Sequence, residues 1–210
     1  MALLLGLILL NCVPARANEI VIATPDTLYL NGTAKIPVTA AQLSTMSSIS
    51  DGTETLSFDP APFATTFARW GFLGVESPTP GEVVQSFSQA STGITLSLPQ
   101  LTFGLEIANA ESHSLDVTVL FEQGTSVLAT ISRTLDSRGG AQLFALTGTI
   151  PIDNVIISVD GPTVGYGMGE FRYGEVLTTV PEQSSFFLLG AGSIVLALLL
   201  RRRTARAAAR

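Results

Sequence analysis

The sequence predicts an all-β protein whose body is an antiparallel, two-sheet β-sandwich of jelly-roll-like type. Three observations predict this class: apolar residues alternate with period two, turn-forming residues interrupt them at short intervals, and long apolar runs occur only near the two ends. The 210 residues are therefore divided into a signal peptide at 1–17, an extracytoplasmic β-sandwich at 18–179 and a tail at 180–210 with one transmembrane helix.

The first 17 residues have the pattern of a secretory signal peptide. The apolar run Ala2–Leu10 spans only about 14 Å as a helix, which is too short to cross a bilayer. Pro14 ends the run, and the small side chains of Ala15 and Ala17 suit a signal peptidase, so cleavage is expected after Ala17. A buried N-terminal strand and a lipid-modified Cys12 are the alternatives.

Strands are expected throughout the body. Period-two alternation is clearest in Leu101–Ala108, Leu115–Glu122 and Val155–Asp160. Shorter β-rich runs are Glu19–Ala23, Thr53–Phe58, Ala64–Trp70, Glu82–Phe87, Gly93–Leu98, Thr125–Ser132 and Ala141–Thr147. Turn residues separate these runs at 51–52, 77–81, 122–124, 138–140 and 160–162. One competing helix is expected, at Ala40–Ser48.

The C-terminal end predicts a membrane helix with fixed orientation. Ser184–Leu200 contains 17 residues without a charge and is apolar on all faces. Arg201, Arg202 and Arg203 follow at once, and positive residues stay on the cytoplasmic side of a membrane. The body is therefore expected on the other side of the inner membrane.

A short motif, Val180-Pro181-Glu182-Gln183, precedes this helix. A Pro-Glu motif, a glycine-containing apolar helix and a terminal arginine cluster, in this order, resemble the PEP-CTERM sorting tail. The resemblance implies recognition by an exosortase, a membrane cysteine transpeptidase, in a Gram-negative-type bacterium that often exports polysaccharide. Gln183 stands where the family has a second proline. A plain membrane anchor without cleavage is the alternative.

The stretch 101–174 is also similar to the β-sandwich body common in PEP-CTERM proteins, on the segments 101–107 and 165–174. Bodies of this kind often end in a glycine-bounded run with two adjacent aspartates. Gly169 and Glu170 occupy these two positions here, so a ligand or calcium function carried by the first acidic residue is not expected to transfer.

Composition excludes several classes of function. The body carries five basic and 16 acidic residues, a net charge of −11, which argues against nucleic acid as a partner. One Cys and one His in the whole chain exclude an internal disulfide, a Cys-based zinc site and a His cluster. His113 lies in a predicted loop, and no G-x-S-x-G motif surrounds any serine, so no enzyme is expected.

Three aromatic residues are candidate glycan contacts: Trp70, Tyr166 and Tyr173. A Trp at this place is more often part of the core. Alternation places Gly165, Gly167 and Gly169 on one face of the last strand, with Tyr166, Met168 and Glu170 opposite. Such a bare strip could approach a sugar, or it could pack under a large neighbour.

No cofactor is expected, although loop oxygens could hold a structural calcium ion. The candidate ligands are Asp153, Asn154, Asp160 and Glu170, and solvated turn residues are the alternative.

These observations together predict an exported, non-enzymatic protein of the cell surface or extracellular matrix. Its expected partners are signal peptidase and the export machinery, the inner membrane, an exosortase and exopolysaccharide, as in a biofilm. The protein would be anchored transiently in the inner membrane before it reaches the surface or is released. A lectin-like adhesin is the alternative, and a secreted hydrolase is a third hypothesis.

Overall fold

The computed structural model describes residues 19–38, 44–65, 70, 76, 83–87, 89–137, 140–160 and 165–175. They form one short helix, α1 (Thr27–Gly32), and eleven strands. The strands are β1 (Ile20–Ile22), β2 (Ala34–Ile36), β3 (Ser48–Ser50), β4 (Thr55–Asp59), β5 (Phe63–Thr65), β6 (Val83–Phe87), β7 (Ser91–Asn109), β8 (Leu115–Gln123), β9 (Ser126–Leu135), β10 (Gln142–Asp160) and β11 (Gly165–Gly174). All strand pairings are antiparallel.

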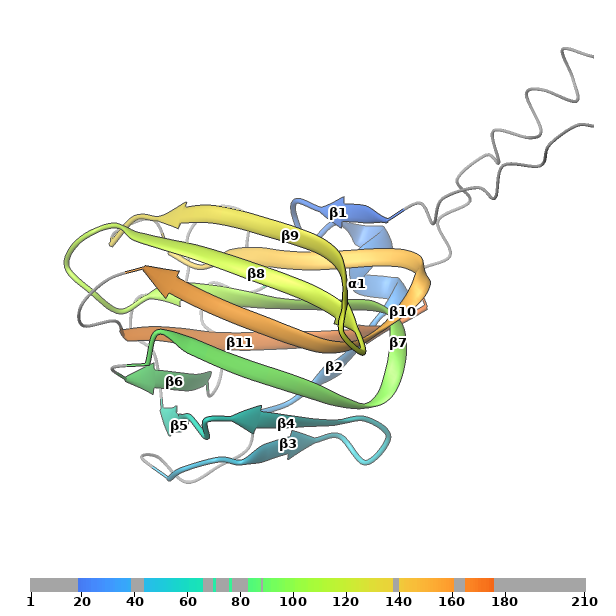
Figure 1. Ribbon diagram of the computed structural model, residues 1–210, viewed down its shortest axis with the longest axis horizontal. Helices are drawn as coiled ribbons and strands as arrows, with labels where there is room; N and C mark the ends of the chain where they lie inside the picture. The colour runs from blue at the N-terminus through green and yellow to red at the C-terminus, as the bar shows by residue number, and fades with distance from the viewer. Residues whose placement is uncertain are drawn as a thin grey trace, which may run out of the picture. The chain divides into compact units, whose positions relative to one another are not determined.

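Two 19-residue strands, β7 and β10, determine the architecture because each runs through both layers of the fold. Their mutual register shifts between Thr147 and Ile152, where each strand bends from one layer into the other (Figure 1). Layer I has the order β3-β4-β7-β10-β8-β9 and uses residues 91–100 and 152–160 of the long strands. Layer II has the order β5-β6-β11-β7-β10-β1 and uses residues 102–109 and 142–147, with β2 beside β11.

The main hydrophobic core lies between the two layers. Phe58 of layer I contacts Phe171 of layer II, with ring centroids 5.9 Å apart. The hydroxyls of Thr92 and Tyr166 form a buried hydrogen bond of 2.6 Å between the same layers. Alternation explains the core, because every second residue of β8 and of the second half of β10 is buried in it.

Helix α1 packs against the outer face of layer II. The Asp26 side chain caps it by accepting a hydrogen bond from Tyr29 N (2.8 Å). Tyr29 is 2% exposed and packs with Leu143 and Ala145. The absence of a side chain on Gly104 permits this approach, because a Cβ there would collide with the Tyr29 hydroxyl.

The all-β, antiparallel class predicted from the sequence is confirmed, with one difference: the two predicted sheets are parts of a single hydrogen-bonded sheet. The expected strands at 93–98 and 101–108 are one strand, as are those at 141–147 and 155–160. The helix expected up to Ser48 is wrong for its described part, because Thr45 forms a β-bridge and β3 begins at Ser48. Helix α1 was not anticipated.

None of the helices among the described residues has the length and apolar character needed to span a bilayer. The signal peptide, with Ala15 and Ala17, the sorting motif 180–183, the segment 184–200 and Arg201–Arg203 lie outside the described residues. The chain divides into a compact unit of residues 1–176 and a second of residues 177–210, and every described residue belongs to the first.

Candidate functional site

The outward side of layer I is a regular surface that β-alternation leaves uncovered by the core. Because Val117, Val119 and Phe121 are buried, the residues between them point outward from β8. The same alternation in β4, β7, β9 and β10 extends this surface across five strands. We define the open face as Ser57, Ser91, Gly93, Thr95, Thr118, Leu120, Glu122, Thr130, Ser132, Asn154, Ile156 and Ser158, all exposed or half-buried.

One row of the open face consists of hydroxyl side chains. The strand register aligns Ser91, Ser158, Thr118 and Ser132 across β7, β10, β8 and β9. The hydroxyls of Thr118 and Ser132 are hydrogen-bonded to each other at 2.9 Å. Neighbouring strands are about 4.8 Å apart, so the row extends over about 14 Å.

A second polar row runs parallel to the first, four residues along the strands. Ser57, Thr95, Asn154 and Glu122 align across β4, β7, β10 and β8. The Asn154 Nδ2 donates to Glu122 Oε2 at 2.8 Å, which fixes the orientation of the amide. The same contact fixes the direction of the Asn154 amide oxygen and of the other Glu122 carboxylate oxygen. The side chains of Ser57 and Thr95 are exposed.

Between the polar rows lies a less polar one, made of Gly93, Ile156, Leu120 and Thr130, with the exposed Asp59 of β4 at its end opposite Gly93. Each row is about 7 Å from the next along the strands. An extended molecule that lies along this central row would contact aliphatic carbon beneath it and polar groups on both sides. Sugars present this combination, because their rings have C–H faces and hydroxyl edges.

The charge of layer I limits the ligands that its open face can bind. Its strands carry five carboxylates, Asp59, Asp116, Glu122, Asp153 and Asp160. Their one basic residue is Arg133, whose guanidinium lies over the Phe144 ring at 5.5 Å. An anionic polymer would be repelled, whereas a neutral or cationic one would not.

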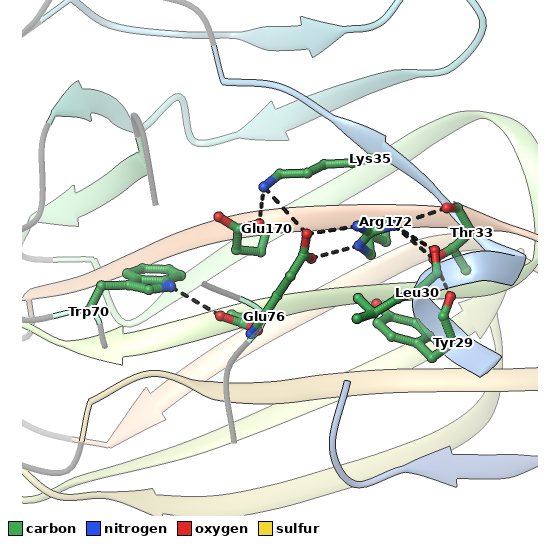
Figure 2. Close-up of polar contacts among 9 residues, drawn as sticks. Tyr29, Leu30, Thr33, Lys35, Trp70, Glu76, Glu170 and Arg172 are labelled. Carbon is green, nitrogen blue, oxygen red and sulfur yellow. Dashed lines mark hydrogen bonds and ion pairs between the residues drawn. The ribbon is translucent and has the colours of Figure 1, made fainter. Parts of the chain in front are cut away.

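A second polar assembly lies on the outer face of layer II, and Figure 2 shows it. We call it the carboxylate cluster and define it as Lys35, Glu76, Glu106, Glu170 and Arg172. Glu106 stands in β7 between two core residues and is 1% exposed. It accepts hydrogen bonds from Trp70 Nε1 (3.0 Å) and from Glu76 N (2.5 Å). Burial raises the pKa of Glu106 to about 7, and the charges of Glu170 and Glu76 add to this effect.

Glu76 and Arg172 form the centre of the cluster (Figure 2). Arg172 donates to both Glu76 oxygens, at 2.6 and 2.7 Å, and to the backbone oxygens of Leu30 and Thr33. Burial acts to raise the pKa of Glu76, but the Arg172 hydrogen bonds and the Lys35 charge outweigh it and hold the pKa below its usual value. Lys35 Nζ lies 3.6 Å from Glu76 Oε1.

Glu170 occupies an irregular position in β11. The register between β11 and β7 shifts between Gly169 and Arg172, so two residues of β11 oppose one residue of β7. Glu170 takes φ 51° in this bulge, a left-handed conformation that favours glycine. Its buried carboxylate pairs with Lys35, and burial raises the pKa of the carboxyl.

Carboxylates with pKa values displaced in opposite directions are a feature of acid–base catalysis. In this cluster, however, both oxygens of Glu106 accept donors of the chain itself, and Glu76 is held by Arg172. The side chains of Glu76 and Glu170 are 14% and 2% exposed. The cluster therefore joins α1, β2 and the residues Trp70 and Glu76 to layer II, and leaves no free carboxylate for a substrate.

The aromatic residues predicted to contact glycans do not offer a ring face. Trp70, Tyr166 and Tyr173 are 1%, 0% and 8% exposed. Their polar atoms bond to Glu106, Thr92 and Asp51 respectively. Stacking of a sugar on these rings is thus a wrong expectation, and the core alternative holds for Trp70.

The glycine strip of β11 is covered as well. A Cβ on Gly169 would lie 3.2 Å from Trp70 Cη2 and 3.0 Å from Val83 Cγ1. Gly169 therefore packs under large neighbours, which was the alternative to contact with a sugar. The bulge also corrects the expected facing of Glu170, which lies with Lys35 and Glu76 and not beside the core residues Tyr166 and Met168.

The candidate calcium ligands have protein partners. Asp153 accepts hydrogen bonds from Gly124 N, Asn154 bonds to Glu122, and Glu170 pairs with Lys35. Asp160 ends β10 in an exposed position. Within the described ranges, no group of three or more His, Cys, Asp or Glu residues is placed to hold a metal ion. His113 is exposed in the loop after β7.

The sequence matches no protein-family model and no curated protein. Among solved structures, the chain is similar to a CBM22-1 xylan-binding domain from Paenibacillus barcinonensis Xyn10C (12% identity, 59% of this chain, 87% of that chain, TM-score 0.36). It is also similar to a family 11 carbohydrate-binding module from Clostridium thermocellum (9% identity, 69% of this chain, 96% of that chain, TM-score 0.35). A third similar structure is a family 29 module from Piromyces equi (13% identity, 75% of this chain, 90% of that chain, TM-score 0.28). TM-scores this low do not establish a shared fold.

Proposed function

We propose that the chain is an exported, non-enzymatic protein of the cell surface or extracellular matrix, whose body binds uncharged polysaccharide through the open face. The observation that carries this proposal is the arrangement of the three rows: the aliphatic pair Leu120 and Ile156 at the centre, with hydrogen-bonding side chains on both sides. The rows belong to a rigid sheet, so little conformational entropy is lost when a ligand binds.

The polar rows supply both donors and acceptors, which a sugar hydroxyl requires because it is both at once. The hydroxyls of Ser91 and Thr95 point outward and are exposed, and the Asn154 amide is held by Glu122. Binding would rest on hydrogen bonds and aliphatic contact without aromatic stacking, so we expect weak affinity for one sugar and stronger affinity for a polymer that spans several rows.

An enzymatic role is not supported by any described group. The carboxylates with displaced pKa values are engaged by groups of the chain itself: Glu106 by Trp70, Glu76 by Arg172, Glu170 by Lys35 and Asp51 by Tyr173. A binding role requires no such group, and it agrees with a body whose charge of −11 keeps it soluble and repels anionic polymers.

Binding is tested with the purified chain against a neutral glucan, a uronic-acid polymer and a glucosamine polymer. We expect retention by the neutral glucan and a loss of about 2- to 10-fold in affinity for Asn154→Ala and Thr95→Ala, since one hydrogen bond contributes about 0.5–1.5 kcal/mol. Thr149→Ala is the matched control, because Thr149 is exposed outside the open face. Binding to the uronic-acid polymer alone, or equal losses in all three variants, contradicts the proposal.

Export and sorting form the second part of the proposal, and the sequence of the tail supports them. Val180-Pro181-Glu182-Gln183, the apolar run 184–200 and the arginines after it have the order of an exosortase substrate. Replacing Pro181 and Glu182 by Ala should keep the chain in the membrane at its uncleaved mass, whereas the parent chain is released. Equal release of both chains contradicts sorting through this motif.

A further inference from the structure

Strand β9 is an open edge of layer I. It has ten residues, Ser126–Leu135, and among the described residues it pairs with β8 alone. Figure 1 shows it as the outermost strand of its layer. An edge strand leaves the backbone N–H and C=O groups of every second residue without a strand partner, and such a row can pair with another chain.

The other strands at the margins of the described sheet are much shorter. β1, β3 and β5 have three residues each, and short edges give a second chain little to pair with. Proteins commonly protect long edges with proline, lysine or exposed charges. The sequence of β9, SVLATISRTL, has no proline, no lysine and no acidic residue.

The single charge of β9 is directed away from its outward side. Arg133 lies on the same, inward face of β9 as the buried Ile131 and Leu135, and its guanidinium lies over the Phe144 ring. Burial lowers the pKa of Arg133. The outward residues Thr130 and Ser132 are exposed and uncharged. Because the body is strongly acidic, two copies repel each other over most of their surface. β9 itself brings no carboxylate to such a contact, although Asp136 follows it directly and Asp116 of β8 accepts a hydrogen bond from the Thr134 hydroxyl.

Two features limit how a second strand can be added. The register shift between Phe121 and Glu122 leaves Leu128 unpaired, which makes the first part of β9 irregular. At the other end, the backbone oxygens of Leu135 and Thr134 accept hydrogen bonds from the side chains of Asn109 and Gln142, so the regular open edge is 129–133. A twofold-symmetric pair uses this edge in both copies, so only the three-residue edges remain among the described strands. Such pairing stops at two copies and does not continue into a fibre.

We infer that two copies of this chain associate through antiparallel pairing of β9 with β9, which joins the two layers I into one continuous sheet. We take the partner to be a second copy and not a foreign peptide, because the two identical edges are uncharged although the body is strongly acidic. Their antiparallel pairing requires no rearrangement of either copy. The dimer places two open faces side by side. Its existence does not depend on what the open face binds.

The test compares the full chain with Thr130→Lys and Thr95→Lys in a mild detergent, by mass in solution at about 0.1 to 100 μM, a range that brackets a Kd of about 1 μM. Thr130→Lys places two like charges at the seam and should raise the dimer Kd at least about tenfold. Thr95→Lys puts the same charge on the same layer, away from β9, and should leave the Kd unchanged. Trp70 fluorescence confirms that both variants are folded.

Hydrogen exchange gives an independent measurement. Backbone amides of residues 129–133 that are not bonded to β8 should exchange more slowly in the dimer than in the diluted monomer, and amides of β3 should not change. A parent chain that stays monomeric over the whole range overturns the inference. So does a dimer that survives Thr130→Lys, because the association would then lie in another part of the chain.

Discussion

Glu106 makes the stability of the protein depend on pH in an unusual direction. Its pKa is about 7 in the folded protein and 4.5 in an unfolded chain. Between pH 4.5 and 7 the folded protein therefore keeps a proton that the unfolded chain has released, so the stability falls as the pH rises through this window. The difference corresponds to about 3 kcal/mol, since one pKa unit equals about 1.36 kcal/mol.

The perturbation is Glu106→Gln, which removes the titration and keeps the shape of the side chain. Urea unfolding is followed through the fluorescence of Trp70, the only tryptophan of the chain, which donates directly to Glu106. From pH 5 to pH 8 we expect the free energy of unfolding of the parent to fall more steeply than that of the variant, by about 2–3 kcal/mol.

The variant also loses one acceptor oxygen, which costs about 1–3 kcal/mol at every pH. The two stability curves should therefore converge, or cross, toward pH 8. Any other group that titrates in this window is present in both proteins, so the difference between the slopes reports Glu106 together with its coupling to Glu76 and Glu170. Equal slopes in the two proteins would refute the reasoning, because Glu106 would then be ionised in the folded protein throughout the window.

Three further predictions concern the packing around the carboxylate cluster. Glu170→Gly should destabilise less than Glu170→Ala, by about 1 kcal/mol in urea unfolding, because both remove the partner of Lys35 and only glycine relieves φ 51°; equal losses would contradict backbone strain there. Gly104→Ala should cost about 1–3 kcal/mol and shift the environment of Tyr29, since the new Cβ would lie 2.5 Å from Ala145 Cβ; an unchanged melting temperature would contradict this close packing. Asp26→Ala should cost about 1 kcal/mol through loss of the α1 cap, whereas Asp26→Asn should cost less; equal costs for the two substitutions would show that capping is not the cause.

Local pattern predicted most of the strands because alternation reports burial directly. Leu115–Glu122 was expected and β8 is Leu115–Gln123, since Val117, Val119 and Phe121 have no other way to reach the core. The bends within β7 and β10 were not predictable in this way. Pro99 and Pro151 interrupt the alternation, and in a sequence an interruption has the same appearance whether a strand ends or turns into another layer.

The sites were harder to predict, because both depend on neighbours that are distant in sequence. The outward positions of β8 were implied by alternation, but the alignment of Thr118 with Ser91 and Ser158 requires the register of three strands. Glu106 gave a usable signal, because it is the single carboxylate of β7 and stands between the apolar residues Leu105 and Ile107. Its partners Trp70 and Glu76 are about thirty residues away and gave none. The aromatic residues failed as surface candidates because their size suits a core as well as a sugar.

The layer order has a kinetic consequence. β1 pairs with β10 through Ile20 and Thr147, and β2 pairs with β11 through Ile36 and Phe171. Strands from the start of the body therefore cannot pair until strands near its end have been synthesised. Folds rich in such distant pairings form slowly, because the entropic cost of closing long loops arises before the stabilising contacts between distant residues form. The nascent chain cannot complete either layer until nearly all of its body has been synthesised. We therefore expect the core between the two layers to close only when synthesis of the body is nearly complete.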